Sequence, residues 1–215
     1  MAAELPSEAA RKGVNAIIPL ALLRTLRELD QSHPIDYEEL SGDLAPRRLG
    51  TSATVLAQIE RFQKLVKRGR PADGKEVLQL FSLVGRRNDA ELAFDQAGRE
   101  AAAEILRLTT GPQKLVQKAG KVVARQRVER KLASGLADRL LDVELSFDDE
   151  NGVKGVANGS LHELANEGQS CGFYGSAIAE ILRRCANFEG AMLHTDCRAR
   201  GDEICAWNST ARPDS

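Results

Sequence analysis

The spacing of apolar residues changes near residue 139, and this change limits the fold classes open to the chain. Up to about residue 135, apolar side chains recur every three or four positions, as they do in amphipathic helices. Beyond residue 139, Leu141, Val143, Leu145 and Phe147 alternate with polar residues, which is the period of a strand with one solvent-exposed face. We therefore predict an α+β fold, in which a helical amino-terminal region is followed by an antiparallel sheet packed against helices.

Several helices in series are expected before residue 135. The first carries one apolar stripe, with Pro19 in its first turn: Ile17, Leu20, Leu23, Leu26 and Leu29. Residues 31–50 form a connector, and a second helix contains Val55, Ile59, Phe62 and Val66 and stops near Gly69. Two further helices begin at patterns that resemble capping boxes, Asp73 with Glu76 and Asn88 with Glu91. The fourth is expected over 89–108 and a fifth over 112–134.

The last third of the chain is predicted to hold two hairpins around one helix. Asn151-Gly152 is a strong hairpin signal, so a second strand through about Asn158 pairs with the first. An amphipathic helix covers 172–186, and strands over 191–198 and 203–208 are joined by a tight turn at 200–202. The final 210–215 form a frayed tail. We divide the chain into a helical region 1–87, which is a possible dimer or partner interface, and a second unit 88–209.

Charge and hydropathy exclude some classes of protein. The formal net charge is -1, so the overall charge does not favour binding to nucleic acid or to a membrane surface. Residues 112–139 are locally basic, and they are either an anion-facing surface or a solvated face balanced by the acidic segment 142–150. Apolar runs are too short for a membrane span, and the first residues do not resemble a secretion signal. We therefore expect a cytoplasmic protein with reduced cysteines.

The four cysteines all lie between residues 171 and 205. Cys197 and Cys205 are equally far from Gly201, so a turn centred there places them opposite one another on paired strands. Two such sulfurs suit one tetrahedral zinc and also permit a strained disulfide. The spacing alone leaves open a zinc site and a cluster of buried or redox-active thiols.

Two further residues are candidates for the same cluster. Cys171 opens a helix, where the amide dipoles help a thiol to lose its proton, and His194 lies three residues before Cys197. An odd spacing points His194 to the opposite face of a regular strand, so a bulge or a strand end must turn it. Cys185 lies about 21 Å along the helix from Cys171, and we interpret it as a small buried hydrophobe.

These residues carry a resemblance to a known family. The run Cys171-Gly172-Phe173-Tyr174-Gly175, the helix that follows, and the run from Cys197 to Trp207 resemble the vinyl-reductase-type ligand-binding domain named for bacteriochlorophyll biosynthesis proteins. The same domain is the sensor of aromatic-responsive bacterial activators, and its fold is similar to subunits of the TRAPP vesicle-tethering complex. The resemblance runs from about Asn88 to Ser209, and its specific part is 171–207. The short segment from Gly13 to Pro19 also looks like the opening of the bacteriochlorophyll-type members.

The resemblance implies a structural zinc. In the aromatic-sensing members the ion is held by a cysteine at a helix start, an acidic residue, and two cysteines flanking a glycine turn. The matching positions are Cys171, His194, Cys197 and Cys205, with His194 in place of the acid. Histidine is an equally good zinc ligand, and four protein ligands leave no open position for a catalytic water.

The resemblance also implies a small-molecule pocket between the sheet and the helices beside the zinc. Its candidate apolar lining is Phe147, Phe173, Tyr174, Met192 and Trp207, and each of these is otherwise an ordinary core residue. His162 is a candidate polar contact, or else a surface or capping histidine. The chain has neither a nucleotide-binding glycine loop nor a dinucleotide fingerprint, so the reductase name does not imply that activity.

These observations predict a non-catalytic ligand-binding or sensor module that acts through a partner or a homodimer. Its ligand is a small hydrophobic or aromatic molecule. The alternatives are a carrier or accessory protein for a tetrapyrrole or similar hydrophobic molecule, a TRAPP-like assembly protein without a ligand, and a thiol enzyme that uses Cys171 or Cys185. A membrane span is not expected, and nucleic acid is not the expected partner.

Overall fold

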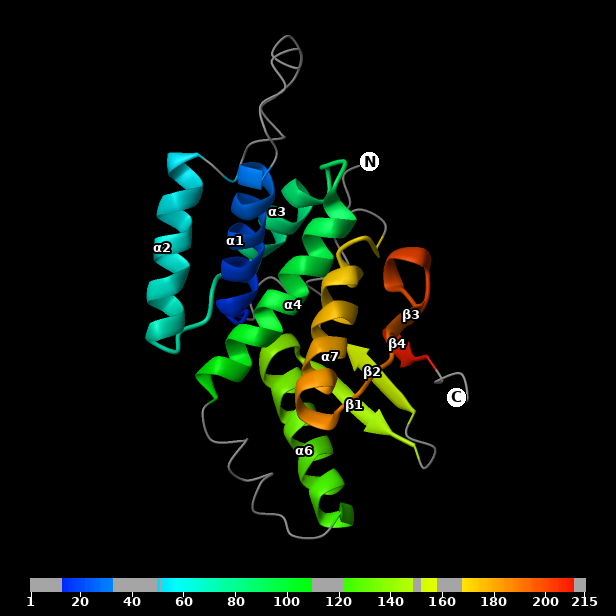
Figure 1. Cartoon of the computed structure of the whole chain (residues 1–215). Helices are drawn as coiled ribbons and strands as arrows, with labels where there is room; N and C mark the ends of the chain where they lie inside the picture. Colours follow the sequence, from blue (N-terminus) through cyan, green and yellow to red (C-terminus); the bar gives the residue numbers. More distant parts are fainter. Residues whose placement is uncertain are drawn as a thin grey trace.

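The computed structural model describes residues 13–32, 50, 52–109, 122–148, 152–157 and 168–210. These residues form six α-helices and one four-stranded antiparallel sheet, which confirms the mixed helix and sheet predicted from the periodicity (Figure 1). The helices are α1 (Ile17–Ser32), α2 (Ala53–Lys67), α3 (Gly74–Val84), α4 (Ala90–Leu108), α6 (Val122–Leu141) and α7 (Cys171–Ala186). The strands are β1 (Val143–Phe147), β2 (Val153–Ala157), β3 (Met192–Asp196) and β4 (Cys205–Ser209). Within the described ranges, no helix combines the length and the apolar character that a membrane crossing requires.

The sheet joins the two predicted hairpins. Its strand order is β1-β2-β4-β3, so β4 pairs with both β2 and β3. Val143 and Leu145 of β1 are buried while Glu144 and Ser146 are exposed, as the alternation predicts. Phe147 pairs with Val153 across the first hairpin. The predicted turn residue Asn151 and the predicted strand end Asn158 lie outside the described residues.

Helix α7 is the centre of the molecule. It lies alongside α4 and also contacts α6 and β3 (Figure 1). Its core residues Phe173, Ala177, Ile178, Ile181 and Leu182 are fully buried. Small residues on α4 permit the close approach of the two helices, because a Cβ added at Gly98 would overlap the carbonyl oxygen of Phe173. Ser176 of α7 donates a hydrogen bond to Asp95 of α4 across the same contact.

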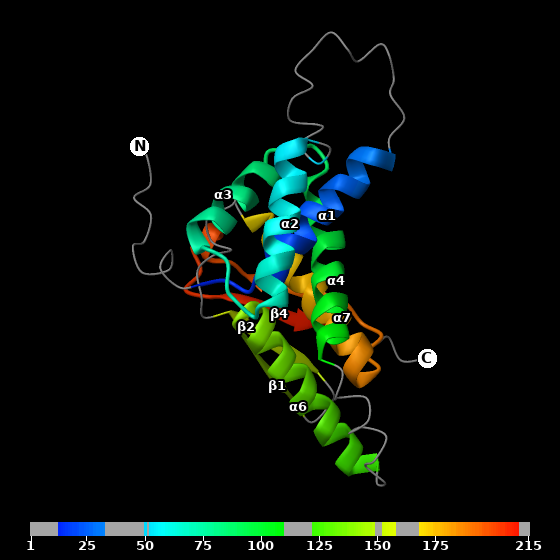
Figure 2. The ribbon, with the colours of Figure 1, turned by 90° about the vertical axis from the view of Figure 1, so that its left-hand side faces the viewer.

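The amino-terminal helices share this core. The predicted stripe of α1 is buried as expected, but Ile18, Ala21 and Leu22 are buried as well. The reason is that α1 packs against α4, α2 and α3, so that more than one of its faces is covered (Figure 2). One cluster of buried side chains runs from α1 through α4 and α7 to the sheet.

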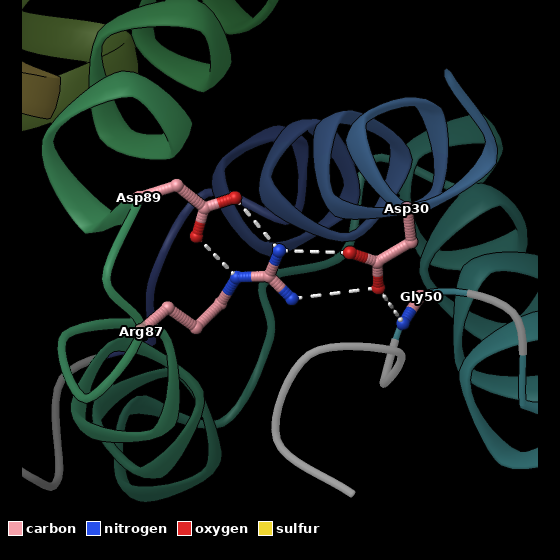
Figure 3. A network of polar contacts seen from close by, with 4 residues as sticks. All are labelled: Asp30, Gly50, Arg87 and Asp89. Carbon is pink, nitrogen blue, oxygen red and sulfur yellow. Dashed lines mark hydrogen bonds and ion pairs between the residues drawn. The ribbon is translucent and has the colours of Figure 1, made fainter. Parts of the chain in front are cut away.

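A buried ion network ties the end of α1 to the start of α4 (Figure 3). The guanidinium of Arg87 donates to Asp30 at 2.7 Å and to both carboxylate oxygens of Asp89. Asp30 also accepts a hydrogen bond from the backbone N–H of Gly50 at 2.8 Å. The side chains of Arg87 and Asp30 are 6% and 1% exposed. The hydrogen bond to Asp89 and the two carboxylate charges raise the pKa of Arg87 above its usual value although burial opposes this, so the network keeps its cation.

Two helix-end predictions are wrong, and the predicted cap at Asp73 is confirmed. Asp73 caps α3 by accepting from the backbone N–H groups of Lys75 and Glu76, as predicted. At α4 the N-cap residue is Asp89 instead of Asn88, and its carboxylate binds Arg87 instead of capping the helix. The helix expected to end at residue 134 continues to Leu141, where Asp142 takes a left-handed conformation with a φ of 58°. The cause is that Ala137 and Leu140 extend its buried face. Residues 112–121 of that predicted helix lie outside the described residues.

Two glycine substitutions separate helix packing from helix propensity. Gly98→Ala is expected to lower the free energy of unfolding by about 1–3 kcal/mol, because the new methyl group overlaps α7. Gly135 is also helical but has no neighbouring atom within 4 Å of an added Cβ. Gly135→Ala is therefore expected to raise stability by up to about 1 kcal/mol. Guanidinium chloride unfolding measures both values, and equal effects would contradict the close approach of α4 and α7.

Arg87→Gln is expected to lower the free energy of unfolding by about 3–5 kcal/mol, because it leaves the carboxylate of Asp30 buried without its cation. The matched control is Arg125→Gln, which removes an exposed ion pair with Glu129. That change is expected to cost about 0.5 kcal/mol or less. Chemical unfolding checks both variants, and a loss below about 1 kcal/mol for Arg87→Gln would contradict the role of the network.

Candidate metal centre

Three thiols and one imidazole meet where α7 begins beside the sheet. Cys171 is the first residue of α7, His194 is in β3, Cys197 follows β3, and Cys205 is the first residue of β4. One ligand atom from each residue lies within 4.8 Å of the other three. The three cysteines are fully buried and His194 is partly buried. The four predicted ligands are therefore close enough to bind one metal ion.

The sulfur spacing suits a tetrahedral metal and not a disulfide. The Sγ atoms of Cys171 and Cys197 are 4.0 Å apart. Two thiolates bound at about 2.3 Å to one tetrahedral zinc lie about 3.8 Å apart, whereas a disulfide bond is about 2.05 Å long. All four cysteines of the chain are described, and none forms a disulfide. The donor set fits zinc, since three thiolates and an imidazole are among its preferred structural ligands.

A bulge in β3 turns His194 toward the cysteines. The residue His194 pairs with Trp207, but the next paired residues are Asp196 and Ala206, so Thr195 is inserted between them. This extra residue removes the alternation that would have sent His194 and Cys197 to opposite faces of the sheet. The bulge that the odd spacing required is therefore present.

Hydrogen bonds within the loop from Cys197 to Cys205 position its two cysteines. A short 3-10 helix, Arg198–Arg200, follows Cys197, and Gly201 closes the turn with a φ of 101°. The carboxylate of Asp202 accepts a hydrogen bond from the Cys197 N–H, and the Arg198 N–H donates to Cys205 Sγ at 3.4 Å. Such contacts outside the metal-binding atoms orient the ligands and stabilise their negative charge. The predicted turn at 200–202 is thus part of a longer cysteine loop.

Gly168 and Asp202 are the site residues that sequence reasoning missed. Gly168 has a φ of 92°, and a Cβ there would lie 2.8 Å from Cys197 Sγ, so a side chain would displace the sulfur. A glycine three residues before Cys171 was the available signal, but glycine spacing alone does not distinguish a loop from a close approach. Asp202 was identified only as a turn residue.

Aromatic stacking holds the imidazole in place. The ring of His194 stacks on Trp207 at 5.1 Å between centroids, and Trp207 stacks on Tyr174 at 5.8 Å. His194 Nε2 is buried and has no hydrogen-bond partner among the described residues. A buried imidazole nitrogen without a partner is costly unless it binds a proton donor or a metal. The unpartnered nitrogen leaves the imidazole of His194 available to bind an ion.

Without a cation, the surroundings of Cys171 oppose the loss of its thiol proton. The hydrogen bond to Cys205, burial, and the proximity of Cys205 and Cys197 all raise the pKa of Cys171 well above its usual value. The Cys171 thiol therefore retains its proton until a divalent cation replaces it. Cys185 is outside this group and is buried as predicted, and burial raises its pKa to about 11.

The five predicted pocket residues occupy three different environments. Met192 and Trp207 line a pocket of about 230 Å³ beside the metal centre, together with Cys171 and His194. Phe147 lines a separate pocket of about 930 Å³ near the first hairpin. Phe173 and Tyr174 are buried core residues that line neither of these two pockets. His162 lies outside the described residues, as do Lys114, Lys118 and Lys121 of the basic segment.

No family model matches the chain, and no curated protein matches it either.

Metal analysis of the purified protein is expected to find one zinc per chain. Cys205→Ser removes a ligand, and it is expected to abolish zinc retention and to lower the melting temperature. Cys185→Ser changes a cysteine outside the cluster and keeps the zinc. Elemental analysis after gel filtration measures the content, and a zinc-free wild type with unchanged stability after metal addition would contradict the site.

Proposed function

We propose that this protein is a non-enzymatic module that binds a small apolar molecule beside a structural zinc site. The observation that carries the proposal is that the pocket and the metal centre share walls. Cys171 and His194, two of the four candidate ligands, line the pocket of about 230 Å³. A ligand in this pocket would therefore contact the residues that hold the ion in place.

The zinc would stabilise the contact between the central helix and the sheet. Its four ligands come from the start of α7, from β3, from the loop and from β4, so one ion would join the central helix to two strands. Four protein ligands complete a tetrahedral zinc and leave no position for an activated water. A structural role is therefore the better interpretation of this donor set, and it supports a protein without catalytic activity.

The shape of the pocket indicates the size of its ligand. Met192 and Trp207 line it together with small residues and with polar side chains. The small residues are Gly172, Gly175, Ala179, Gly190 and Ala191, and the polar ones are Asp95, Arg99, Ser176 and Arg183. A volume of about 230 Å³ exceeds the roughly 150 Å³ of an engineered cavity that binds benzene. The pocket therefore suits one substituted aromatic ring, which agrees with the resemblance to aromatic-responsive sensors.

Helix α7 would carry the signal. It begins at Cys171, lines the pocket, and packs along α4, which in turn packs against α1. A ligand that binds better to one position of α7 would shift the population toward that position. We propose that the amino-terminal helices present this change to a partner or to a second copy in the cytoplasm. The tetrapyrrole carrier would need a larger cavity than this one, such as the pocket of about 930 Å³ near the first hairpin. The ligand-free assembly protein is an outcome of the test below.

The test fills the pocket without changing the metal ligands. An added Cβ at Gly172 meets no atom within 4 Å, so Gly172→Leu extends a side chain at the pocket wall with little strain. Zinc-loaded wild type is expected to bind phenol or toluene in calorimetric titration, and Gly172→Leu is expected to weaken binding at least 10-fold with its zinc content unchanged.

Gly135→Leu is the matched control, because it introduces the same side chain at an exposed helical glycine that does not line the pocket. It is expected to bind as wild type does. If zinc-loaded protein binds neither probe, the ligand-binding function is wrong and the assembly role replaces it.

A further inference from the structure

The smaller pocket is lined by two of the elements that also supply the metal centre. Helix α7 lines it at positions from Cys171 to Arg183, and β3 lines it with Met192 and His194. Cys171 and His194 are therefore both pocket residues and candidate metal ligands. An ion bound to both of them would join the two elements that a small molecule in the pocket contacts.

Trp207 is a second link between the two sites. Its indole lines the pocket and stacks on the imidazole of His194 at 5.1 Å between ring centroids. On the α7 side, a Cβ added at Gly175 would lie 3.2 Å from Cδ1 of the same indole. A molecule in the pocket therefore lies against a ring whose position limits that of His194 and that packs closely on α7.

The structure has both sites formed in one conformation. One ligand atom from each of the four metal-centre residues lies within 4.8 Å of the other three, while the pocket keeps a volume of about 230 Å³. The approach of the four residues therefore does not close the pocket. Two ligands that bind the same conformation each raise its population, so each favours the binding of the other. The coupling between the sites therefore has a positive sign.

The metal-free protein has a reason to leave this conformation. His194 Nε2 is buried and has no hydrogen-bond partner among the described residues. A buried polar nitrogen without a partner is unfavourable, and a metal-free imidazole would gain a partner by turning toward water. Because the imidazole stacks on Trp207, that turn would also change the wall of the pocket. A metal-bound imidazole would be held in place.

We propose that the two sites are coupled, so that zinc raises the affinity of the smaller pocket for an apolar aromatic molecule and that molecule raises the affinity for zinc. By thermodynamic linkage, the two factors are equal. This inference rests on the proposed function, because it needs a zinc and a ligand at these sites. It adds a regulatory role to the structural one: the protein would respond to its ligand only when the metal is present.

Toluene and zinc measure the coupling in both directions. Calorimetric titration compares toluene binding by zinc-loaded and metal-free wild type, and competition with a chromophoric chelator measures zinc affinity with and without saturating toluene. Metal-free protein is expected to bind toluene at least 10-fold more weakly, and saturating toluene is expected to raise the zinc affinity by the same factor. Equal toluene affinity of the two forms would overturn this inference and leave the proposed function intact. If zinc-loaded protein does not bind toluene, both are wrong.

Circular dichroism of the metal-free protein distinguishes local coupling from loss of the fold. Its helix content is expected to stay close to that of the zinc-loaded form, because one cluster of buried side chains joins α1, α4, α7 and the sheet without an ion. Loss of the helix signal would mean that zinc acts on the whole fold, which would overturn a coupling between two neighbouring sites.

Filling the pocket tests whether toluene acts from this site. In Gly172→Leu, toluene is expected to leave the zinc affinity unchanged, because the new side chain takes the place of the ligand. Gly135→Leu is the matched control at an exposed glycine outside the pocket lining, and it is expected to keep the wild-type coupling. If toluene still raises the zinc affinity of Gly172→Leu, the molecule acts from elsewhere and the inference is wrong.

Discussion

The close packing of α7 between α4 and the sheet is the constraint on which the other features depend. Gly98 lets the α4 backbone approach Phe173, and on the opposite side Gly155 of β2 leaves space for Ile178. The α4 contact is with the α7 backbone and the β2 contact is with the Ile178 side chain, and together they limit the position of α7. The first residue of that helix is Cys171, so the same packing places its sulfur beside the loop that carries Cys197 and Cys205. The candidate metal centre is therefore a consequence of helix packing as much as of the four residues that form it.

Local patterns predicted most of the elements, because they depend on neighbours in the sequence. The change from helical to alternating spacing is such a pattern, and so are the cap at Asp73 and the symmetry of two cysteines about Gly201. The errors arose where distant residues decide. Asp89 binds Arg87 as part of a network that reaches Asp30, a residue 57 positions from Arg87, and no local pattern shows that this carboxylate is engaged. Helix α6 passes residue 134 because its later residues are buried by the sheet and α7, which is again a long-range effect.

The candidate site also has a part that local sequence patterns predict and a part that they do not. The four residues of the candidate metal centre were identified from spacing and residue type, and they lie close together as predicted. The odd spacing of His194 correctly required a bulge. The pocket lining was less predictable, because an aromatic residue that faces a cavity and one that fills the core have the same sequence pattern. Phe173 and Tyr174 pack in the core, while Met192 and Trp207 face the smaller pocket and Phe147 faces the larger one. Only the position of each side chain in the folded structure distinguishes a residue that lines a pocket from one that fills the core.

The stacking of His194 on Trp207 gives the molecule a built-in optical probe. Trp207 is the only tryptophan in the chain, and its indole lies between Tyr174 and the imidazole of a candidate ligand. The same indole forms part of the floor of the smaller pocket. Its emission would therefore respond to ion loading and to occupancy of that pocket, so that one spectrum of the native protein would report both events without an attached label.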